Sequence, residues 1–145
     1  SWVQSDILSA ILFGQLEQKE DIYRARMKIY NRYEGELASW ANRNSVRAPF
    51  VPTGCEHTAH VFHYRFERGE QRDQFIAHLA KHGINAVFHY QPLHLSTVGQ
   101  QLGGKPGQFP VTEHAGDCLV RLPLFSSMTA EQQTRVIEAV ASFCP

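Results

Sequence analysis

Long hydrophobic runs are missing from the sequence. No apolar stretch approaches the roughly 20 residues that a membrane-spanning helix requires, and nothing resembles a signal peptide, so no membrane partner is predicted. Cysteine is also scarce: Cys55, Cys118 and Cys144 are odd in number and widely spaced, with no CxxC pair among them. This usage indicates neither a disulfide framework nor a thiolate metal site, and it fits a reducing cytoplasm.

Excess charge of either sign is absent as well. Fourteen basic residues balance fourteen acidic ones in a chain of 145 residues. Proteins that bind nucleic acid usually carry a basic surface, so no nucleic-acid partner is predicted. The eight histidines are the one compositional excess. At this length the whole chain, residues 1–145, is expected to form a single domain with a core of its own.

Residues 1–43 are predicted to form one or two long helices that lead into this domain. Ser5 suits an N-cap, and Asp6 places a negative charge in the first turn. Apolar residues then recur at helical spacing as far as Trp40, with a break expected within 18–21. The first helix is apolar on several sides, which indicates that it needs more cover than a small domain provides.

Strand patterns follow a connection rich in proline and glycine. Aromatic and polar residues alternate over 60–66, which predicts a strand with two distinct faces. Residues 70–82 carry a short apolar stripe, and Gly83 suits the left-handed cap at the end of a helix. A buried strand over 86–89 is expected next. Strand, helix and strand in so short a space indicate a split or crossover unit.

The last third of the chain predicts one more strand and one more helix. Residues 118–122 read as a strand that ends at Pro123, and Thr129 begins a capping box for a helix with an apolar face. Residues 91–117 are expected to be a long, irregular connection, whose Leu102–Gly107 run lacks the GxxxxGK[ST] pattern of a phosphate-binding loop. The predicted fold class is α+β: a small, mainly antiparallel sheet of three to four strands with helices packed on one side.

Three histidines raise the question of a metal site. His57, His60 and His63 follow an HxxHxxH spacing that would converge on a helix and could bind zinc together with Cys55. On the predicted strand, however, His60 and His63 point to opposite faces. No metal ligand is therefore predicted, and His60 is expected to be a buried, hydrogen-bonded histidine beside Phe62. A histidine-based metal-binding domain stays open as an alternative.

Another histidine pair lies at the end of the strand over 86–89. This strand leads into His89, Tyr90 and His94, with a proline between them. A strand end fixes the position of such rings while the following loop leaves them accessible, which is typical of binding sites. Packing of the rings at the end of the sheet is the competing interpretation. Arg121 is a candidate phosphate contact, although a strand-edge salt bridge is the favoured interpretation.

Six segments stand out in order along the chain: Ser5–Ile7, Gln15–Glu17, Ala59–Phe62, Ala86–His94, Phe109–Glu113 and Arg121–Leu124. Together they resemble the DegT/DnrJ/EryC1/StrS sugar aminotransferases. The resemblance is greatest to the subgroup of dTDP-4-oxo-6-deoxyglucose 4-aminotransferases (dTDP-4-amino-4,6-dideoxygalactose transaminases). It implies that the chain is the small C-terminal domain of a fold-type-I pyridoxal-phosphate enzyme, with the cofactor-binding large domain absent. A start at Ser1 without methionine agrees with this expectation.

The resemblance implies an activity, a site and partners for the complete enzyme. The activity is amino transfer from an amino-acid donor to a 4-keto-6-deoxy sugar nucleotide, for lipopolysaccharide or surface polysaccharide biosynthesis, by a cytoplasmic homodimer. The segment from His89 to His94 lies near the active-site cleft in such enzymes, so His89, Tyr90 and His94 are predicted to bind the substrate.

The cofactor is not expected to bind this chain alone. Pyridoxal 5'-phosphate needs a Schiff-base lysine, and none of the four lysines matches the family's lysine motif. No catalytic residue is therefore predicted, and the isolated chain is expected to be inactive. A stand-alone, non-catalytic sugar-nucleotide-binding module is the remaining alternative. The four lysines are Lys19, Lys28, Lys81 and Lys105.

Overall fold

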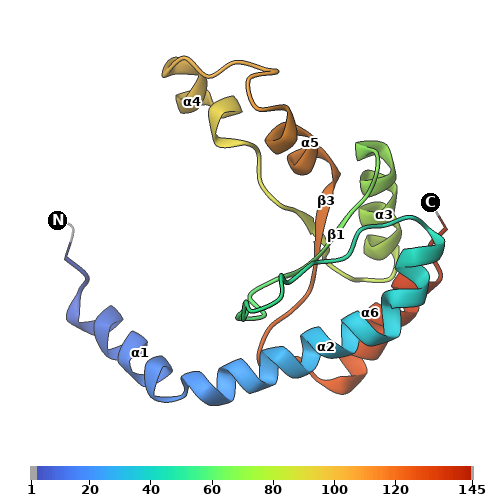
Figure 1. Cartoon of the computed structure of the whole chain (residues 1–145). Coiled ribbons are helices and arrows are strands. Elements are labelled where there is room, and N and C mark those ends of the chain that lie inside the picture. Colours follow the sequence, from blue (N-terminus) through green and yellow to red (C-terminus); the bar gives the residue numbers. More distant parts are fainter. Residues whose placement is uncertain (1–2, 145) are drawn as a thin grey trace.

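A computed structural model describes residues 3–144, and the chain opens with two consecutive helices (Figure 1). Helix α1 spans Asp6–Glu17 and helix α2 spans Lys19–Arg43, with Gln18 between them. The hydroxyl of Ser5 accepts a hydrogen bond from the backbone N–H of Leu8 at 3.4 Å. The N-cap at Ser5 and the break within 18–21, both predicted from the sequence, are thus confirmed.

Helix α2 provides one wall of the core. Its buried residues recur every three or four positions, so they share one face of the helix. The Tyr33 side chain on this face is fully buried, and its hydroxyl donates a hydrogen bond to the Pro123 carbonyl at 2.9 Å. Burial raises the pKa of Tyr33, which keeps the hydroxyl protonated as a donor. The face comprises Ile29, Tyr30, Tyr33, Leu37, Trp40 and Ala41.

Gly35 lies on the opposite, exposed face of α2, where an alanine is expected to stabilise the protein. A Cβ built at this position has no neighbour within 4 Å. Glycine in a helix interior is less favourable than alanine by about 0.5–1 kcal/mol, so Gly35→Ala should raise the free energy of unfolding by that amount. Urea unfolding measures the change. Gly54→Ala is the matched control and should destabilise, because Gly54 has a φ of +82°.

The sheet has three antiparallel strands in the order β1-β3-β2. Strand β1 is Phe62–Arg65, β2 is Val87–Phe88 and β3 is Leu119–Leu122. Since β3 pairs antiparallel with both neighbours, β1 and β2 run parallel to each other and helix α3, Gly69–Lys81, connects them. This is the split unit that the sequence predicted, and Gly83 takes the expected left-handed conformation after α3, with φ +70°.

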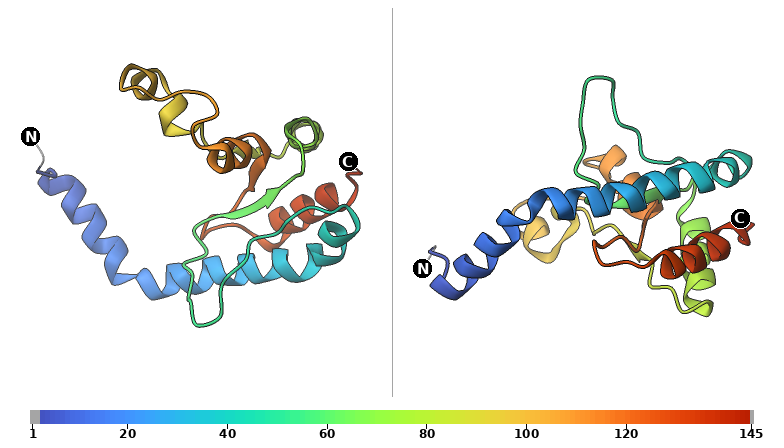
Figure 2. Two further views of the ribbon diagram at one scale, coloured as in Figure 1. Left: turned by 45° about the horizontal axis from the view of Figure 1, so that its top comes forward. Right: turned by 90° about the horizontal axis from the view of Figure 1, so that it is seen from below.

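One face of the sheet carries the core. Phe62 and Tyr64 of β1 and Val120 and Leu122 of β3 are buried on it. Helices α2, α3 and α6 (Ala130–Ala141) supply most of the other core residues, and α2 and α6 run alongside each other in both views of Figure 2. The predicted α+β class and the mainly antiparallel sheet are confirmed.

Helix α6 begins as predicted. The Thr129 hydroxyl accepts from the Gln132 backbone N–H at 3.2 Å, and the Gln132 side chain accepts from the Thr129 N–H at 2.9 Å. This reciprocal pair is a capping box, which satisfies two N–H groups at the start of the helix. The predicted apolar face of this segment is also buried: Val136, Ile137, Val140 and Phe143.

Two expectations about the middle of the chain are wrong. Strand β2 has only two residues and is not buried, because it lies at the sheet edge: Phe88 is 51% exposed. The connection over 91–117 is not irregular, because it contains a short 3₁₀ helix, η1 (Leu93–Leu95), and helices α4 (Thr97–Gln101) and α5 (Pro110–Cys118). Pro110 lies in the first turn of α5, where backbone N–H groups have no partner within the helix, so its missing N–H costs no hydrogen bond.

His60 also differs from its expectation, because its side chain is exposed rather than buried in the core. The buried residue at this point is Ala59, which has a φ of +48°. The guanidinium of Arg26 donates hydrogen bonds to the backbone carbonyls of both Ala59 and His60. These bonds hold the turn before β1, so this segment reaches the sheet with His60 directed to solvent.

Helix α1 buries none of its residues and extends away from the rest of the chain (Figure 1). This agrees with the prediction that it requires cover from outside the domain. Within residues 3–144, no helix is both long and apolar enough to cross a membrane. The exposed apolar side chains of α1 are Ile7, Leu8, Ile11, Leu12, Phe13 and Leu16.

Candidate functional site

Tyr90 follows β2 in a backbone conformation that non-glycine residues rarely adopt, with φ +61°. Its ring lies over the guanidinium of Arg121, with 4.9 Å between Cζ and the ring centroid. The ring of His89 lies 4.4 Å from that of Tyr90, centroid to centroid. Such backbone strain costs about 1–3 kcal/mol and is concentrated at functional sites, so this strand end is the first candidate.

The strand register brings a third element to this point. Arg121 of β3 lies opposite His63 of β1 on one side and opposite Val87 of β2 on the other. Residues directly opposite in an antiparallel pair share a face of the sheet, here the face away from the core. His63, His89, Tyr90 and Arg121 therefore form one group, which we call the rim cluster.

The surroundings of the rim cluster favour the neutral form of its two imidazoles. Burial lowers the pKa of His63, and the nearby His89 and Arg65 lower it further. Burial is also the main cause that lowers the pKa of His89, and the positive charge of Arg121 and the proximity of His60 lower it further. A neutral imidazole has one N–H donor and one acceptor nitrogen. The rim cluster therefore combines donors, acceptors and one fixed positive charge.

Two polar atoms of the rim cluster lack a partner. His89 Nδ1 and Arg121 Nε are both buried and form no hydrogen bond with any described residue. Arg121 also forms no ion pair within residues 3–144, so the predicted strand-edge salt bridge is wrong and the ring of Tyr90 takes its place. Burying an unpaired polar atom costs about 1–3 kcal/mol, so the cluster is incompletely satisfied within this chain.

His94 belongs to a different set of contacts. Its Nε2 lies 2.9 Å from Glu113 Oε1, and its ring meets that of Phe109 edge-on at 4.9 Å. The side chain of His94 is only 11% exposed and lines a cavity of about 540 Å³ beside η1 and α4. The structure thus brings His89 and Tyr90 together, whereas His94 is held by α5.

Glu113 is the centre of this second set. Besides His94, its carboxylate accepts hydrogen bonds from the backbone N–H groups of Gly107 at 2.9 Å and Phe109 at 3.2 Å. In the neutral imidazole, a bond from Nε2 to the carboxylate places the proton on Nε2 and leaves Nδ1 of His94 as an acceptor. Sequence reasoning missed this role of Glu113, although the residue follows Pro110 by three positions, in the first turn of α5.

We expect the His94 contacts to loosen in acid. The pKa of Glu113 is lowered by the N–H of Gly107, then by the bond from His94. A carboxyl group with a lowered pKa stabilises the folded state fully above its ordinary pKa of about 4.3, and this contribution is lost as the pH falls through the lowered value. Chemical shifts of the Gly107 and Phe109 amides, followed from pH 7 to 3, should move with one midpoint below about 4.3. Glu113→Gln should remove this step, and a midpoint above the ordinary value would contradict the assignment.

Metal-ligating residues do not gather in the described part of the chain. No group of three or more histidine, cysteine, aspartate or glutamate side chains is placed to hold an ion. The His57 ring is engaged elsewhere: its Nδ1 accepts a hydrogen bond from the Ala59 backbone N–H at 3.2 Å, and the ring packs on that of Tyr30. The HxxHxxH spacing therefore does not produce a shared site in residues 3–144.

Comparison with known proteins identifies the family. Residues 4–141 match the model of the DegT/DnrJ/EryC1/StrS aminotransferase family. The chain belongs to this family. It is 41% identical over 94 residues to the pleiotropic regulatory protein of Geobacillus stearothermophilus, covering 64% of the chain and 25% of that protein. It is 31% identical to dTDP-3-amino-3,4,6-trideoxy-alpha-D-glucose transaminase of Micromonospora megalomicea, covering 93% of the chain and 36% of the relative.

Solved structures of sugar aminotransferases share the fold. Spr1654 of Streptococcus pneumoniae superimposes with a TM-score of 0.84 at 26% identity, covering 96% of the chain and 35% of that protein. Spr1654 has been solved in an apo form, a PLP form and a PMP form. The chain spans about a third of the length of such relatives.

The residues of this family member do not by themselves fit a Schiff-base site for pyridoxal phosphate. A lysine that forms a Schiff base is usually desolvated in a pocket, which lowers its pKa and activates the amine. All four lysine side chains are exposed, and none lines the cavity beside η1 and α4 that His94 lines. No step of amino transfer is therefore assigned to a lysine of this chain.

Proposed function

We propose that this family member is the C-terminal domain of a pyridoxal-phosphate-dependent sugar-nucleotide aminotransferase. Three findings support the proposal: the family match over 4–141, the superposition on about a third of Spr1654, and the exposure of every lysine. In the complete enzyme an N-terminal large domain would hold the cofactor and its lysine. Helix α1, which buries none of its apolar side chains here, would pack on that domain.

In this proposal the rim cluster and His94 bind the substrate. The observation that carries the assignment is the strained Tyr90, held over Arg121 beside His89. The phenol and the neutral imidazole of His89 would hydrogen-bond the sugar ring or its diphosphate, and Nδ1 of His94 would accept from a sugar hydroxyl. Arg121 would supply the positive charge that a diphosphate requires.

The complete enzyme would transfer an amino group from an amino-acid donor to a 4-keto-6-deoxy sugar nucleotide. Pyridoxal phosphate supplies the electron sink for this chemistry when it is bound. The chain described here would bind and orient the sugar nucleotide and exclude water from it. We further propose a cytoplasmic homodimer that acts in surface polysaccharide biosynthesis, with the isolated chain inactive.

One experiment tests whether any lysine of this chain forms the Schiff base. The chain is mixed with pyridoxal phosphate, its absorbance is recorded before and after borohydride reduction, and its intact mass is then measured. The proposal expects no stable Schiff-base band and no stoichiometric added mass. A band trapped in a one-to-one ratio on a single lysine would overturn it. Surface lysines react weakly and without saturation, so a dilution series separates such labelling from a site.

The substrate assignment is tested in the complete enzyme with Tyr90→Phe. Loss of a hydrogen bond to a charged ligand costs about 1.5–3 kcal/mol, so kcat/KM for the sugar nucleotide should fall by about 10- to 150-fold. Tyr23→Phe is the matched control, because Tyr23 is a partly exposed tyrosine on α2 outside the rim cluster. Equal kcat/KM for both variants would remove Tyr90 from the substrate site.

A further inference from the structure

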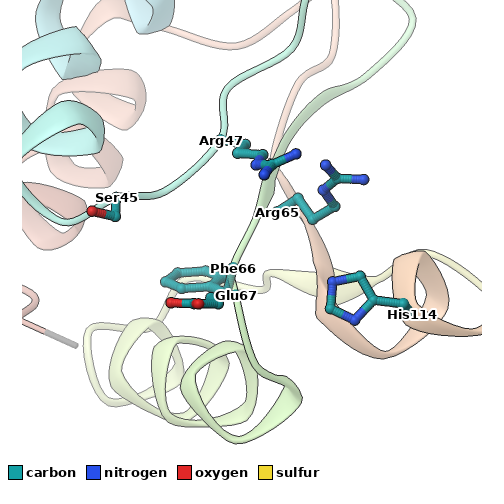
Figure 3. Close-up of a pocket in the computed structure, with 6 residues that line it drawn as sticks. All are labelled: Ser45, Arg47, Arg65, Phe66, Glu67 and His114. Carbon is teal, nitrogen blue, oxygen red and sulfur yellow. The ribbon is translucent and has the colours of Figure 1, made fainter. Parts of the chain in front are cut away.

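A second polar cavity, of about 590 Å³, lies at the carboxyl end of β1 (Figure 3). It shares no residue with the rim cluster, and nothing in the proposed function depends on it. Two of its lining residues are arginines that come from separate segments, and a third is a histidine of α5. The cavity is lined by Ser45, Arg47, Arg65, Phe66, Glu67 and His114.

The two arginines are fixed opposite each other by their backbones. The Arg47 N–H donates to the Arg65 carbonyl at 3.0 Å, and the Arg65 N–H donates to the Arg47 carbonyl at 2.9 Å. Residues that exchange both bonds in this way are direct cross-strand neighbours, and like charges at such positions repel. Figure 3 shows their guanidinium groups next to each other at the cavity. The fold therefore holds two positive charges together.

Nothing in the described chain neutralises this pair. Neither guanidinium forms an ion pair or a side-chain hydrogen bond within residues 3–144, whereas Arg24 and Arg32 of α2 each pair with a carboxylate. The one acidic lining residue, Glu67, lies beside Phe66 in Figure 3 and makes no ion pair with either arginine. Nδ1 of His114 forms a hydrogen bond with the Cys118 sulfur at 3.6 Å.

We propose that this cavity binds a phosphate group through the paired guanidinium groups of Arg47 and Arg65. Guanidinium presents a planar fork of N–H donors that matches phosphate oxygens two at a time, and a phosphate dianion balances two such charges. A carboxylate carries one charge and satisfies one fork, so it fits the pair less well. The cavity, of about 590 Å³, also has room for the rest of a phosphate ester or for a diphosphate.

The test titrates the protein with inorganic phosphate and with pyrophosphate at constant ionic strength, followed by calorimetry. Binding should saturate at one equivalent, and Arg47→Gln or Arg65→Gln should each weaken it at least tenfold. Arg24→Gln is the matched control, an exposed arginine on α2 that should leave the affinity unchanged. Glu67→Gln should tighten binding a few-fold, because it removes a negative charge from the cavity wall.

A second measurement keeps the test decisive if an arginine variant does not fold. The Nε–H resonances of Arg47 and Arg65 in the unmodified protein should shift on addition of pyrophosphate, while that of Arg24 stays in place. Unchanged resonances of both arginines, or the same affinity in the arginine variants as in the unmodified protein, would overturn the proposal. Equal heats for pyrophosphate and for chloride at matched ionic strength would overturn it too.

Discussion

Replacing Trp40 with alanine is expected to lower the free energy of unfolding by about 3–5 kcal/mol, a large fraction of the roughly 5–15 kcal/mol that stabilises a native domain. Trp40 is 2% exposed and lies where α2, the sheet and the end of the chain meet. Its ring centroid lies 5.2 Å from that of Tyr64 and 5.7 Å from that of Phe75. Its indole N–H donates to the Phe143 carbonyl at 2.8 Å, so the substitution also leaves a buried carbonyl unpaired.

Two further variants separate the contributions of Trp40. Trp40→Phe keeps most of the apolar volume but has no N–H to donate to the Phe143 carbonyl. The loss of this hydrogen bond should lower the free energy of unfolding by about 1–3 kcal/mol, in addition to the cost of repacking the smaller ring. Tyr23→Ala, on the partly exposed side of α2, should cost well under 1 kcal/mol. Chemical denaturation of all three variants gives the comparison. A loss below about 1 kcal/mol for Trp40→Ala would mean that α2 is not part of the stable core.

The elements that sequence reasoning predicted correctly are those with local causes. The helical spacing of apolar residues and the caps at Ser5 and Thr129 act within a few residues, and they mark α1, α2 and α6 directly. The alternation in β1 likewise reports the burial of Phe62 and Tyr64. These signals do not depend on which segment packs against which.

The elements that sequence reasoning missed depend on distant partners. The run Ala86–Phe88 has the composition of a buried strand, but only its Ala86 is buried, since β2 lies at the sheet edge. His89 and Tyr90 were predicted together because they are adjacent, whereas the contact of Tyr90 with Arg121 spans two strands. His94 was grouped with them by proximity in sequence, yet Glu113 of α5 holds it instead.

The His94 contacts should be lost when Gly104 is replaced with alanine. The N–H of Gly104 bonds the Gly99 carbonyl at 2.9 Å, and this approach brings the backbone against that of His94. A Cβ at Gly104 would collide with the His94 carbonyl oxygen and lie 2.9 Å from the Gly99 oxygen, and neither is the end of a flexible side chain. The backbone must therefore separate. Limited proteolysis within 99–108 should accelerate at least about tenfold, while the core formed by α2 and α6 stays folded.

Gly103→Ala is the control that isolates this collision. Gly103 has a φ of +96°, but a Cβ there has no neighbour within 4 Å, so alanine introduces only backbone strain. That strain costs about 1–2 kcal/mol, whereas Gly104→Ala should cost more because it must also displace the carbonyl of His94. Equal proteolysis rates for the two variants would show that close packing beside His94 does not hold this segment. A faster rate for Gly104→Ala, with loss of the Gly107 and Phe109 amide shifts that report the hydrogen bonds of Glu113, would show that the close approach at Gly104 holds His94 in position.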